Sequence, residues 1–246
     1  IHTGAGHIPL WDFLKNDGTV QDVEIDPIND VALLQYTGGT TGVSKGAELT
    51  HGNMVANLQQ AKLWVVQQGI VEGKEIILTA LPMYHIFSLT ANAFAWFSWG
   101  ACNVLIPNPR DFVSFVAELK KWKFTAITGV NTLFRALMLQ NGFNEIDFSN
   151  LRVTLGGGMA VQKPVADEWK QRTGCVLLEA YGLTETSPAA CINPATITEF
   201  NGFVGLPLPS TDVVIKDENE KNLNTNQVGE ICIKGPQVMK GYWHRA

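Results

Sequence analysis

Short apolar runs alternate with amphipathic stretches along most of this 246-residue chain, and that alternation restricts its fold more than any other feature. The spacing of the apolar residues predicts strands and helices in turn. The expected strands are 31–36, 75–81, 124–128, 151–155 and 175–180, and the expected helices are 51–68, 112–122, 131–140 and 164–173. Because parallel strands need a crossover connection, this order predicts an α/β fold in which a mainly parallel sheet is flanked by helices.

Local signals support several of the expected helix ends. Thr50 and Asp111 stand where a side-chain oxygen can accept a hydrogen bond from the first turn of a helix. Pro164 suits a first helical turn, and Gly174 suits a helix end.

The pattern changes after about residue 198. Asp212–Lys216 and Glu230–Lys234 are β-branched or alternating in character, and the segment between them is polar and rich in turn-forming residues. This pattern predicts an antiparallel hairpin. We therefore expect residues 1–197 to form an α/β core and residues 198–246 to begin a small β subdomain.

Residues 76–109 contain no Asp, Glu, Lys or Arg. Within them, residues 86–106 are about as long as the roughly 20 residues that a membrane span requires. Asn92, Gly100 and Asn103 interrupt this segment, and basic flanks are missing. A buried helix at about 86–98 followed by a buried strand at about 102–107 explains the same residues, and we prefer that interpretation. The segment would then form a core or the wall of an apolar pocket.

Composition narrows the class of protein. The net charge of −5 and the lack of a Lys/Arg cluster argue against nucleic-acid binding, which depends on a basic surface. The four cysteines are scattered and form no CxxC pair, which is typical of reduced thiols in a cytosolic protein. The first residues do not show the basic and apolar regions of a signal peptide. We therefore expect a cytoplasmic protein.

A loop of unusual composition follows the first expected strand, which we expect to be buried. Residues 36–46 read YTGGTTGVSKG. Glycines allow the backbone to approach a ligand, successive backbone N–H groups can bind an anion, and hydroxyl groups and a lysine can add contacts to phosphate. The candidate phosphate-binding residues are Thr37, Gly38, Gly39, Thr40, Thr41, Gly42 and Lys45. The order of residues is not that of a Walker A loop, and composition alone would also allow a flexible surface loop.

Three further segments complete a recognisable set. Residues 179–186 read EAYGLTET and end an expected strand, residues 81–87 read LPMYHIF, and residues 229–243 read GEICIKGPQVMKGYW. With the loop, these motifs resemble those of the adenylate-forming superfamily. NPRDF (108–112), FTAITGVNTLF (124–134) and GLPLPSTD (205–212) are most similar to a bacterial long-chain fatty acid–CoA ligase.

The resemblance implies a role for each candidate residue. The loop would hold the β- and γ-phosphates of ATP. Thr184 would contact the α-phosphate, and Glu185 would bind Mg²⁺. His85 would lie beside the acyl carboxylate; taken alone, it could equally be an ordinary loop histidine. The adenine would lie against Tyr181 and against the backbone of Gly156, Gly157 and Gly158, and Gly182 would also belong to the nucleotide-binding residues. Phe94, Trp96 and Trp99 could form either an acyl tunnel or ordinary core.

The implied activity is ATP-dependent conversion of a long-chain fatty acid to acyl-AMP, followed by transfer to coenzyme A. Residues 1–197 would then be the ATP- and acyl-binding core. Transfer to a carrier protein and non-catalytic binding of a nucleotide or fatty acid remain alternatives. Relatives also carry a ribose-binding aspartate and a C-terminal domain with a lysine for adenylation, which cannot be assigned here, so we expect the chain alone to have little ligase activity. The resemblance leaves open the oligomeric state and loose attachment to the inner face of the membrane.

Overall fold

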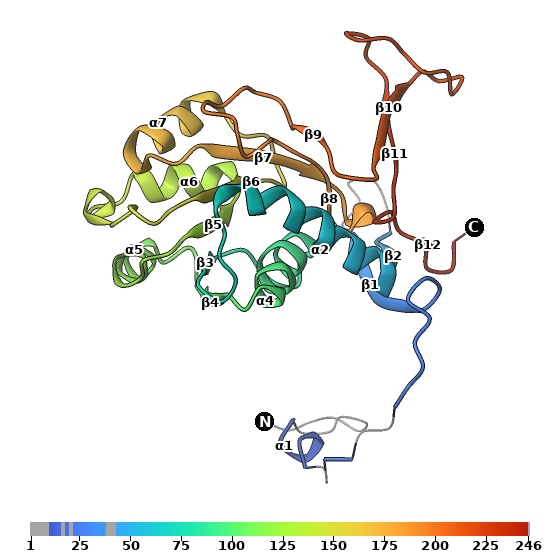
Figure 1. The fold of residues 1–246 in the computed structure, drawn as a ribbon, viewed down its shortest axis with the longest axis horizontal. Helices are drawn as coiled ribbons and strands as arrows, with labels where there is room; N and C mark the ends of the chain where they lie inside the picture. Colours follow the sequence, from blue (N-terminus) through green and yellow to red (C-terminus); the bar gives the residue numbers. More distant parts are fainter. Residues whose placement is uncertain (1–9, 16–17, 20–21, 38–42, 246) are drawn as a thin grey trace.

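A computed structural model describes residues 10–15, 18–19, 22–37 and 43–245. Its centre is a seven-stranded sheet with the order β4-β3-β5-β6-β7-β8-β9 (Figure 1). The strands are β3 (Ile76–Thr79), β4 (Cys102–Leu105), β5 (Ala126–Gly129), β6 (Val153–Gly156), β7 (Leu177–Gly182), β8 (Ala189–Ile192) and β9 (Leu206–Pro207). Strands β3 to β7 are parallel, and β8 and β9 are antiparallel additions. The predicted α/β fold with a mainly parallel sheet is confirmed.

Helices cover both faces of this sheet (Figure 1). One face packs against α2 (His51–Val65), which continues as a 3₁₀ turn over Val66–Gln68, and against α4 (Ala95–Ser98). The opposite face packs against α5 (Phe112–Lys121), α6 (Asn131–Met138) and α7 (Lys163–Thr173).

Alternation of side chains along the strands divides the core between the two faces. In β3 and β5, Ile77 and Ala126 join the α2 and α4 side. Their neighbours Leu78 and Ile127 join the α5, α6 and α7 side. Strands buried on both faces explain why these runs are continuously apolar in the sequence.

The predicted helix caps are confirmed. Thr50 Oγ1 accepts from the Asn53 amide at the start of α2, and an Asp111 side-chain oxygen accepts from the Ser114 amide at the start of α5. Pro164 lies in the first turn of α7, which ends at Gly174 in the left-handed conformation.

The segment without charged residues begins with β3 and continues as a helical run and a second strand. Helix α3 (Ile86–Ser88), a π-helical stretch over Leu89–Phe94 and α4 form one continuous helical run. Strand β4 follows, and it is an edge strand of the sheet. The expectation of a wholly buried strand is wrong, because half of Leu105 is exposed. None of the helices built by the described residues combines the length and apolar character needed to cross a membrane.

A separate three-stranded antiparallel sheet contains β1 (Val31–Thr37), β2 (Lys45–Thr50) and β12 (Gly241–Tyr242). We expected the first strand to be buried and to lead into a ligand-binding loop of the parallel sheet. This expectation is wrong, because β1 pairs with β2 in a hairpin and its side chains are exposed or half-buried. The candidate phosphate loop therefore connects two strands of the small sheet.

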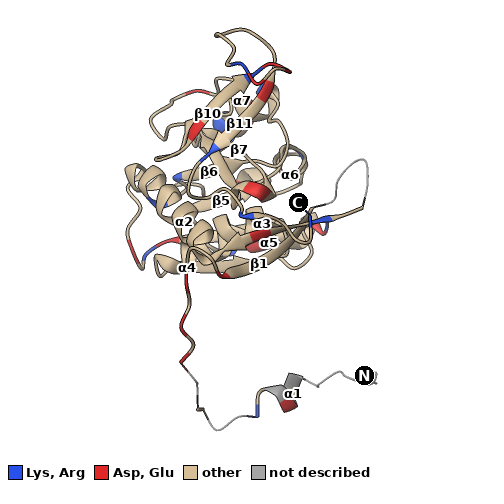
Figure 2. Ribbon diagram, turned by 90° about the vertical axis from the view of Figure 1, so that its right-hand side faces the viewer, with Lys and Arg blue, Asp and Glu red and all other residues tan. Residues whose placement is uncertain are grey.

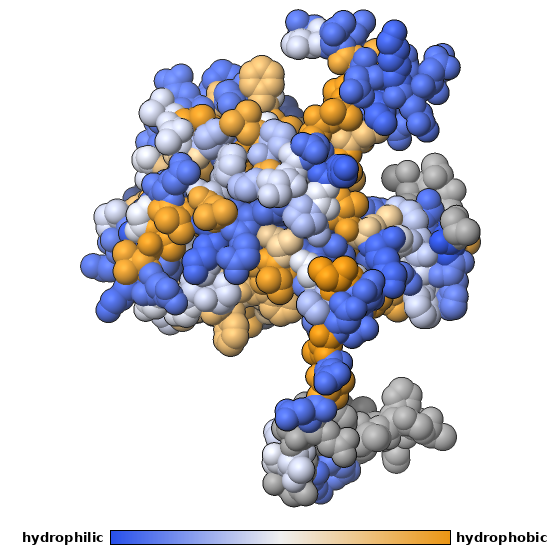
Figure 3. Space-filling view, turned by 45° about the vertical axis from the view of Figure 1, so that its right-hand side comes forward, coloured by the Kyte–Doolittle hydropathy of each residue, from blue (hydrophilic) through white to orange (hydrophobic). Residues whose placement is uncertain are grey.

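Strands β10 (Asp212–Lys216) and β11 (Glu230–Lys234) form the predicted antiparallel hairpin. Figure 3 shows its far end as a hydrophilic knob on a more hydrophobic stem. The boundary at residue 198 stays a prediction. Two of the strands after it pair with earlier strands, β9 with β8 and β12 with β2. Among the described strands, β10 and β11 pair with each other and not with a strand that precedes residue 198.

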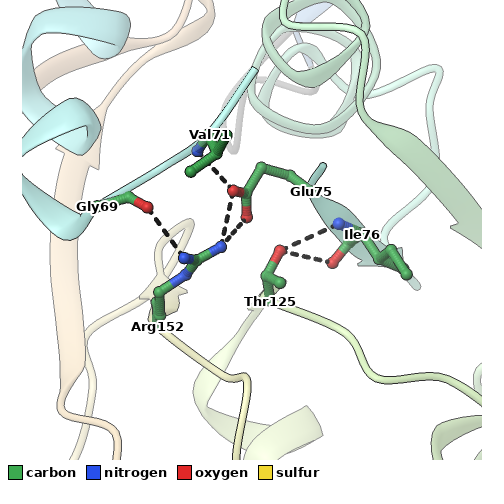
Figure 4. Close-up of polar contacts among 6 residues, drawn as sticks. All are labelled: Gly69, Val71, Glu75, Ile76, Thr125 and Arg152. Carbon is green, nitrogen blue, oxygen red and sulfur yellow. Dashed lines mark hydrogen bonds and ion pairs between the residues drawn. The ribbon is translucent and has the colours of Figure 1, made fainter. Parts of the chain in front are cut away.

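An ion pair between a buried carboxylate and a partly exposed arginine links the amino-terminal ends of two strands (Figure 4). Glu75, which is 1% exposed, precedes β3 and receives two hydrogen bonds from Nη2 of Arg152, at 2.7 and 2.6 Å. Arg152 also donates to the Gly69 carbonyl at 2.9 Å, and the Val71 amide donates to Glu75 at 2.7 Å. This cluster links the end of the α2 segment to two strands at the edge of the sheet away from the candidate site.

Figure 2 shows Lys and Arg dispersed over the part of the chain that the structure describes, interspersed with Asp and Glu. A dispersed distribution does not provide the concentrated basic surface that nucleic-acid binding uses.

Candidate active site

A cavity of about 210 Å³ lies at the carboxyl ends of the parallel strands. This is the edge of an open α/β sheet where ligands bind. The end of β5, the end of β7 and the segments that follow β3, β6 and β7 all contribute to its wall. The wall residues on this side include His85, Thr128, Gly157, Gly158, Tyr181, Gly182 and Thr184. Six of the sequence-predicted site residues therefore surround one cavity.

These candidate nucleotide-binding residues come from two neighbouring strands. Gly157 and Gly158 follow β6, and Tyr181 and Gly182 end β7. Gly158 has φ +75°, a conformation that side chains disfavour. A Cβ at Gly182 would collide with the carbonyl oxygen of Pro188, so glycine is required there by the close approach of the next strand.

Gly156 lies elsewhere. It is buried within β6 and does not line the cavity. A Cβ at this position would stand 2.7 Å from Val161 and 2.8 Å from Leu177. The close packing of these two side chains accounts for a glycine here without a ligand.

His85 caps the short helix α3 at the mouth of the cavity. Its Nδ1 accepts from the Phe87 amide at 3.2 Å, and the residue is exposed. An Nδ1 that accepts leaves the hydrogen of a neutral imidazole on Nε2. His85 can therefore donate a hydrogen bond to a carboxylate without being charged.

Apolar residues from α2 and α4 line the rest of the cavity. Trp96 and Trp99 are 4% and 3% exposed, and their rings meet edge to face with centroids 5.0 Å apart. Both residues line the cavity and also belong to the core beneath the sheet. The two interpretations of these tryptophans, core and pocket wall, are therefore compatible. Phe94 is 43% exposed and does not line the cavity.

A second group of candidate residues lies where the small sheet meets the segment after β7. Thr37 and Lys45 are opposite each other in the register of β1 and β2. The Lys45 ammonium lies 5.1 Å from the centroid of the Tyr242 ring, and the Tyr242 hydroxyl donates to Glu185 Oε1 at 2.5 Å. Glu185 directly follows Thr184 of the cavity wall, so the two groups are continuous.

The predicted contacts at Gly38, Gly39, Thr40, Thr41 and Gly42 lie outside the described residues. The strands that flank them are described, and they hold Thr37 and Lys45 on neighbouring strands. The roles assigned to the loop stay predictions.

Two groups near the site have shifted pKa values. The hydrogen bond to Glu185, with burial and the adjacent negative charge, raises the pKa of Tyr242 to about 12. Its phenol is therefore protonated, and able to donate, at neutral pH. Burial raises the pKa of Glu179, although the Val161 amide donates to its Oε1 at 3.1 Å and partly offsets this effect.

The donor set suits a divalent cation that is shared with a nucleotide. Among the residues that the structure describes, no group of three or more His, Cys, Asp or Glu side chains could hold a metal ion. Mg²⁺ is commonly bound through one or two carboxylates together with substrate phosphates and water. A single carboxylate such as Glu185, together with phosphate oxygens and water, matches this way of binding Mg²⁺. The described residues do not offer a site made entirely of protein ligands.

Several residues of the site were not predicted from the sequence, and Tyr242 and Asn57 are two of them. Tyr242 lies in the quoted segment 229–243, but nothing there indicates that its hydroxyl would reach Glu185. Asn57 lies on the buried face of α2 and lines the cavity. The sequence signal that could have indicated Asn57 is the presence of the polar residues Asn57 and Gln60 on the buried face of α2.

Comparison with known proteins agrees with this site. The family described as "AMP-binding enzyme" matches residues 6–243, and the chain belongs to that family. The long-chain-fatty-acid–CoA ligase of Yersinia pestis is 50% identical over 233 residues, which are 94% of this chain and 41% of that protein. The ligase of the same name from Bacillus subtilis is 37% identical over 223 residues, 90% of this chain and 39% of that protein. The chain thus spans about two fifths of the length of these relatives.

Solved structures show the same fold. Apo MatB from Rhodopseudomonas palustris superposes with a TM-score of 0.79 at 28% identity, covering 92% of this chain and 43% of that one. The long-chain-fatty-acid–CoA ligase FadD1 from Archaeoglobus fulgidus gives a TM-score of 0.78 at 25% identity, covering 91% and 45%. The predicted membership of the adenylate-forming superfamily is confirmed.

Proposed function

We propose that this chain forms the nucleotide- and acyl-binding part of an AMP-forming ligase. Its reaction would join a long-chain fatty acid to ATP, giving acyl-AMP and pyrophosphate, and then transfer the acyl group to the thiol of coenzyme A. The cavity carries this proposal. Its wall combines Tyr181 and the glycines after β6 with the apolar Trp96 and Trp99, and His85 and Thr184 belong to the same wall.

The first reaction requires a carboxylate to attack an α-phosphate that is already negative. Catalysis therefore depends on positioning and on positive or hydrogen-bonding groups, more than on a protein nucleophile. Thr37 and Lys45, with the loop between them, would hold the β- and γ-phosphates. Thr184 would contact the α-phosphate, and the His85 Nε2–H group would orient the attacking carboxylate.

Glu185 would hold Mg²⁺ together with phosphate oxygens. The bound ion supplies positive charge that offsets the charge of those oxygens. The exposed position of Lys45 and the half-buried position of Glu185 leave both groups accessible to a nucleotide.

The apolar part of the cavity supports a hydrocarbon substrate. Each buried CH₂ contributes about 0.8 kcal/mol, which corresponds to roughly fourfold in affinity. Trp96, Trp99 and their neighbours on α2 present an apolar wall for such a chain.

Ligand-dependent thermal unfolding of the chain tests the binding part of this proposal. Mg·ATP and palmitate should each raise the Tm, and acids of increasing length should bind progressively more tightly until the cavity is filled. A chain stabilised by neither ligand would overturn the proposal. ATP–pyrophosphate exchange with the same acids, measured on a form extended to the full length of its relatives, tests the reaction. Failure of every acid to support exchange would exclude adenylation.

A further inference from the structure

Tyr242 contacts both Lys45 and Glu185. Its hydroxyl donates to Glu185 Oε1 at 2.5 Å. Its ring lies 5.1 Å from the Lys45 ammonium, within the roughly 6 Å over which a cation is attracted to an aromatic face. A single side chain therefore joins the candidate phosphate lysine to the candidate metal carboxylate.

The backbone around Tyr242 is held at both sides of this contact. Strand β12 pairs with β2, so that Tyr242 lies opposite Ala47, and the Trp243 amide donates to the Gly46 carbonyl at 2.8 Å. The Met239 amide donates to the Glu185 carbonyl at 2.8 Å. These bonds attach the segment before and after Tyr242 to the two motifs that it connects.

The hydrogen bond leaves half of the carboxylate available. Within the described part of the chain, no hydrogen bond or ion pair engages Oε2 of Glu185. A carboxylate fixed through one oxygen keeps a defined orientation for the other, and hydrogen bonds to metal-binding carboxylates commonly have this purpose.

We propose that Tyr242 is a positioning residue that orients Glu185 toward the divalent cation of a bound nucleotide and keeps Lys45 beside the same phosphates. The inference rests on the proposed function, because it assumes that Glu185 meets a metal–nucleotide complex. It assigns no chemical step to Tyr242, which acts through its two neighbours.

Calorimetric titration of the 246-residue chain with ATP tests this inference, once with excess Mg²⁺ and once in EDTA. Tyr242→Phe removes only the hydroxyl. It should weaken Mg·ATP binding by about 10- to 100-fold, the usual effect of losing a partner of a metal ligand, and leave metal-free ATP binding unchanged. Tyr242→Leu also removes the ring, and it should weaken metal-free ATP binding as well.

A double-mutant cycle gives the decisive comparison. If Tyr242 acts through Glu185, then Tyr242→Phe should add little to the loss caused by Glu185→Gln. Tyr84→Phe is the matched control, because it removes a phenol hydroxyl from a residue that is 82% exposed. It should bind both forms of ATP as the parent does.

The outcomes separate the inference from the proposed function. A parent chain that binds neither form of ATP overturns both. If the parent binds Mg·ATP through Glu185 and the Tyr242→Phe variant binds it equally well, then Tyr242 does not position Glu185. That result overturns this inference and leaves the proposed function standing. Equal losses of Mg·ATP and metal-free ATP binding in Tyr242→Phe would show a general structural effect and also overturn it. Equal metal-free affinities in the Phe and Leu variants would overturn the contribution of the ring to Lys45.

Discussion

The side chain of Asn57 makes the hydrogen bonds to Ala189 that a neighbouring strand would make. Its Nδ2 donates to the Ala189 carbonyl at 2.9 Å, and its Oδ1 accepts from the Ala189 amide at 3.1 Å. Asn57 lies on α2 and is 1% exposed, whereas Ala189 begins β8. A helix side chain thus supports the strand that returns from the Thr184–Glu185 segment.

Asn57→Ala should lower the free energy of unfolding by about 1–3 kcal/mol, since it removes the hydrogen bonds of a buried side chain to the partly buried backbone of Ala189. Urea denaturation measures this change. Gln59→Ala is the control, because Gln59 is exposed on the same helix and should unfold as the parent does. Equal stability of the two variants would contradict the importance of the Asn57 contact.

Glu75→Gln should destabilise the protein in a pH-dependent manner. Burial pushes the pKa of Glu75 upward, but interactions with Thr125, the Val71 amide and Arg152 lower it below the ordinary value of 4.5. A lowered pKa contributes stability above pH 4.5, and this contribution is lost as the pH falls through the folded-state pKa. We expect a loss of about 1–3 kcal/mol at pH 7 that shrinks in acid. Glu72→Gln is the control, because Glu72 is exposed. If Glu75→Gln lowered the free energy of unfolding equally at all pH values, the role assigned to the Glu75 carboxylate would be contradicted.

Glu179→Gln should have the opposite pH dependence. Burial raises the pKa of Glu179 above 4.5, so its stabilising contribution is complete below pH 4.5 and is lost as the pH rises through the raised value. Glutamine keeps an acceptor for the Val161 amide and avoids the buried charge. The variant should therefore gain stability relative to the parent as the pH rises above that value. Thermal unfolding across this range, with Glu218→Gln as an exposed control, would detect the difference.

Trp99→Leu should lengthen the preferred acyl chain. Removing most of the indole enlarges the apolar end of the cavity, and each additional CH₂ that becomes buried should improve affinity by roughly fourfold. The variant should also be less stable, by up to about 3–5 kcal/mol as for other large reductions of buried aromatic residues. Fatty-acid titrations over a series of chain lengths test the shift. Phe97→Leu changes an aromatic residue of the same helix that is 80% exposed, and it should leave the preferred length unaltered.

Lys45→Ala and Glu185→Ala should each lower ATP–pyrophosphate exchange by about 10²–10³-fold, as the loss of one electrostatic contact to a developing charge does elsewhere. The assay requires a form of the protein that supports exchange. Lys74→Ala removes an exposed lysine next to β3 and serves as the control. Near-normal exchange in either variant would contradict the role assigned to that residue.

Local signals predicted the fold better than they predicted the site. Thr50, Asp111 and Gly174 were placed correctly because a helix cap depends on a few adjacent residues. The surroundings of β1 were predicted wrongly because its apolar run does not show that it pairs with β2 in a separate hairpin and not with the parallel sheet. Tyr242 was missed because its partner Glu185 is 57 residues away. Apolar runs reveal that a strand forms, but they do not reveal which strand becomes its neighbour.

The pairing of β2 with β12 has a consequence for synthesis on the ribosome. Strand β2 emerges early, whereas its partner emerges only after the large sheet has been translated. Contacts between distant parts of a chain form late, because the intervening loop must first be closed. A nascent chain can therefore assemble the parallel sheet while the hairpin of Lys45 still lacks its third strand. Translation of Tyr242 then joins the early and late halves of the candidate nucleotide site, so that the proposed binding of a metal–nucleotide complex would become possible only after the scaffold has folded.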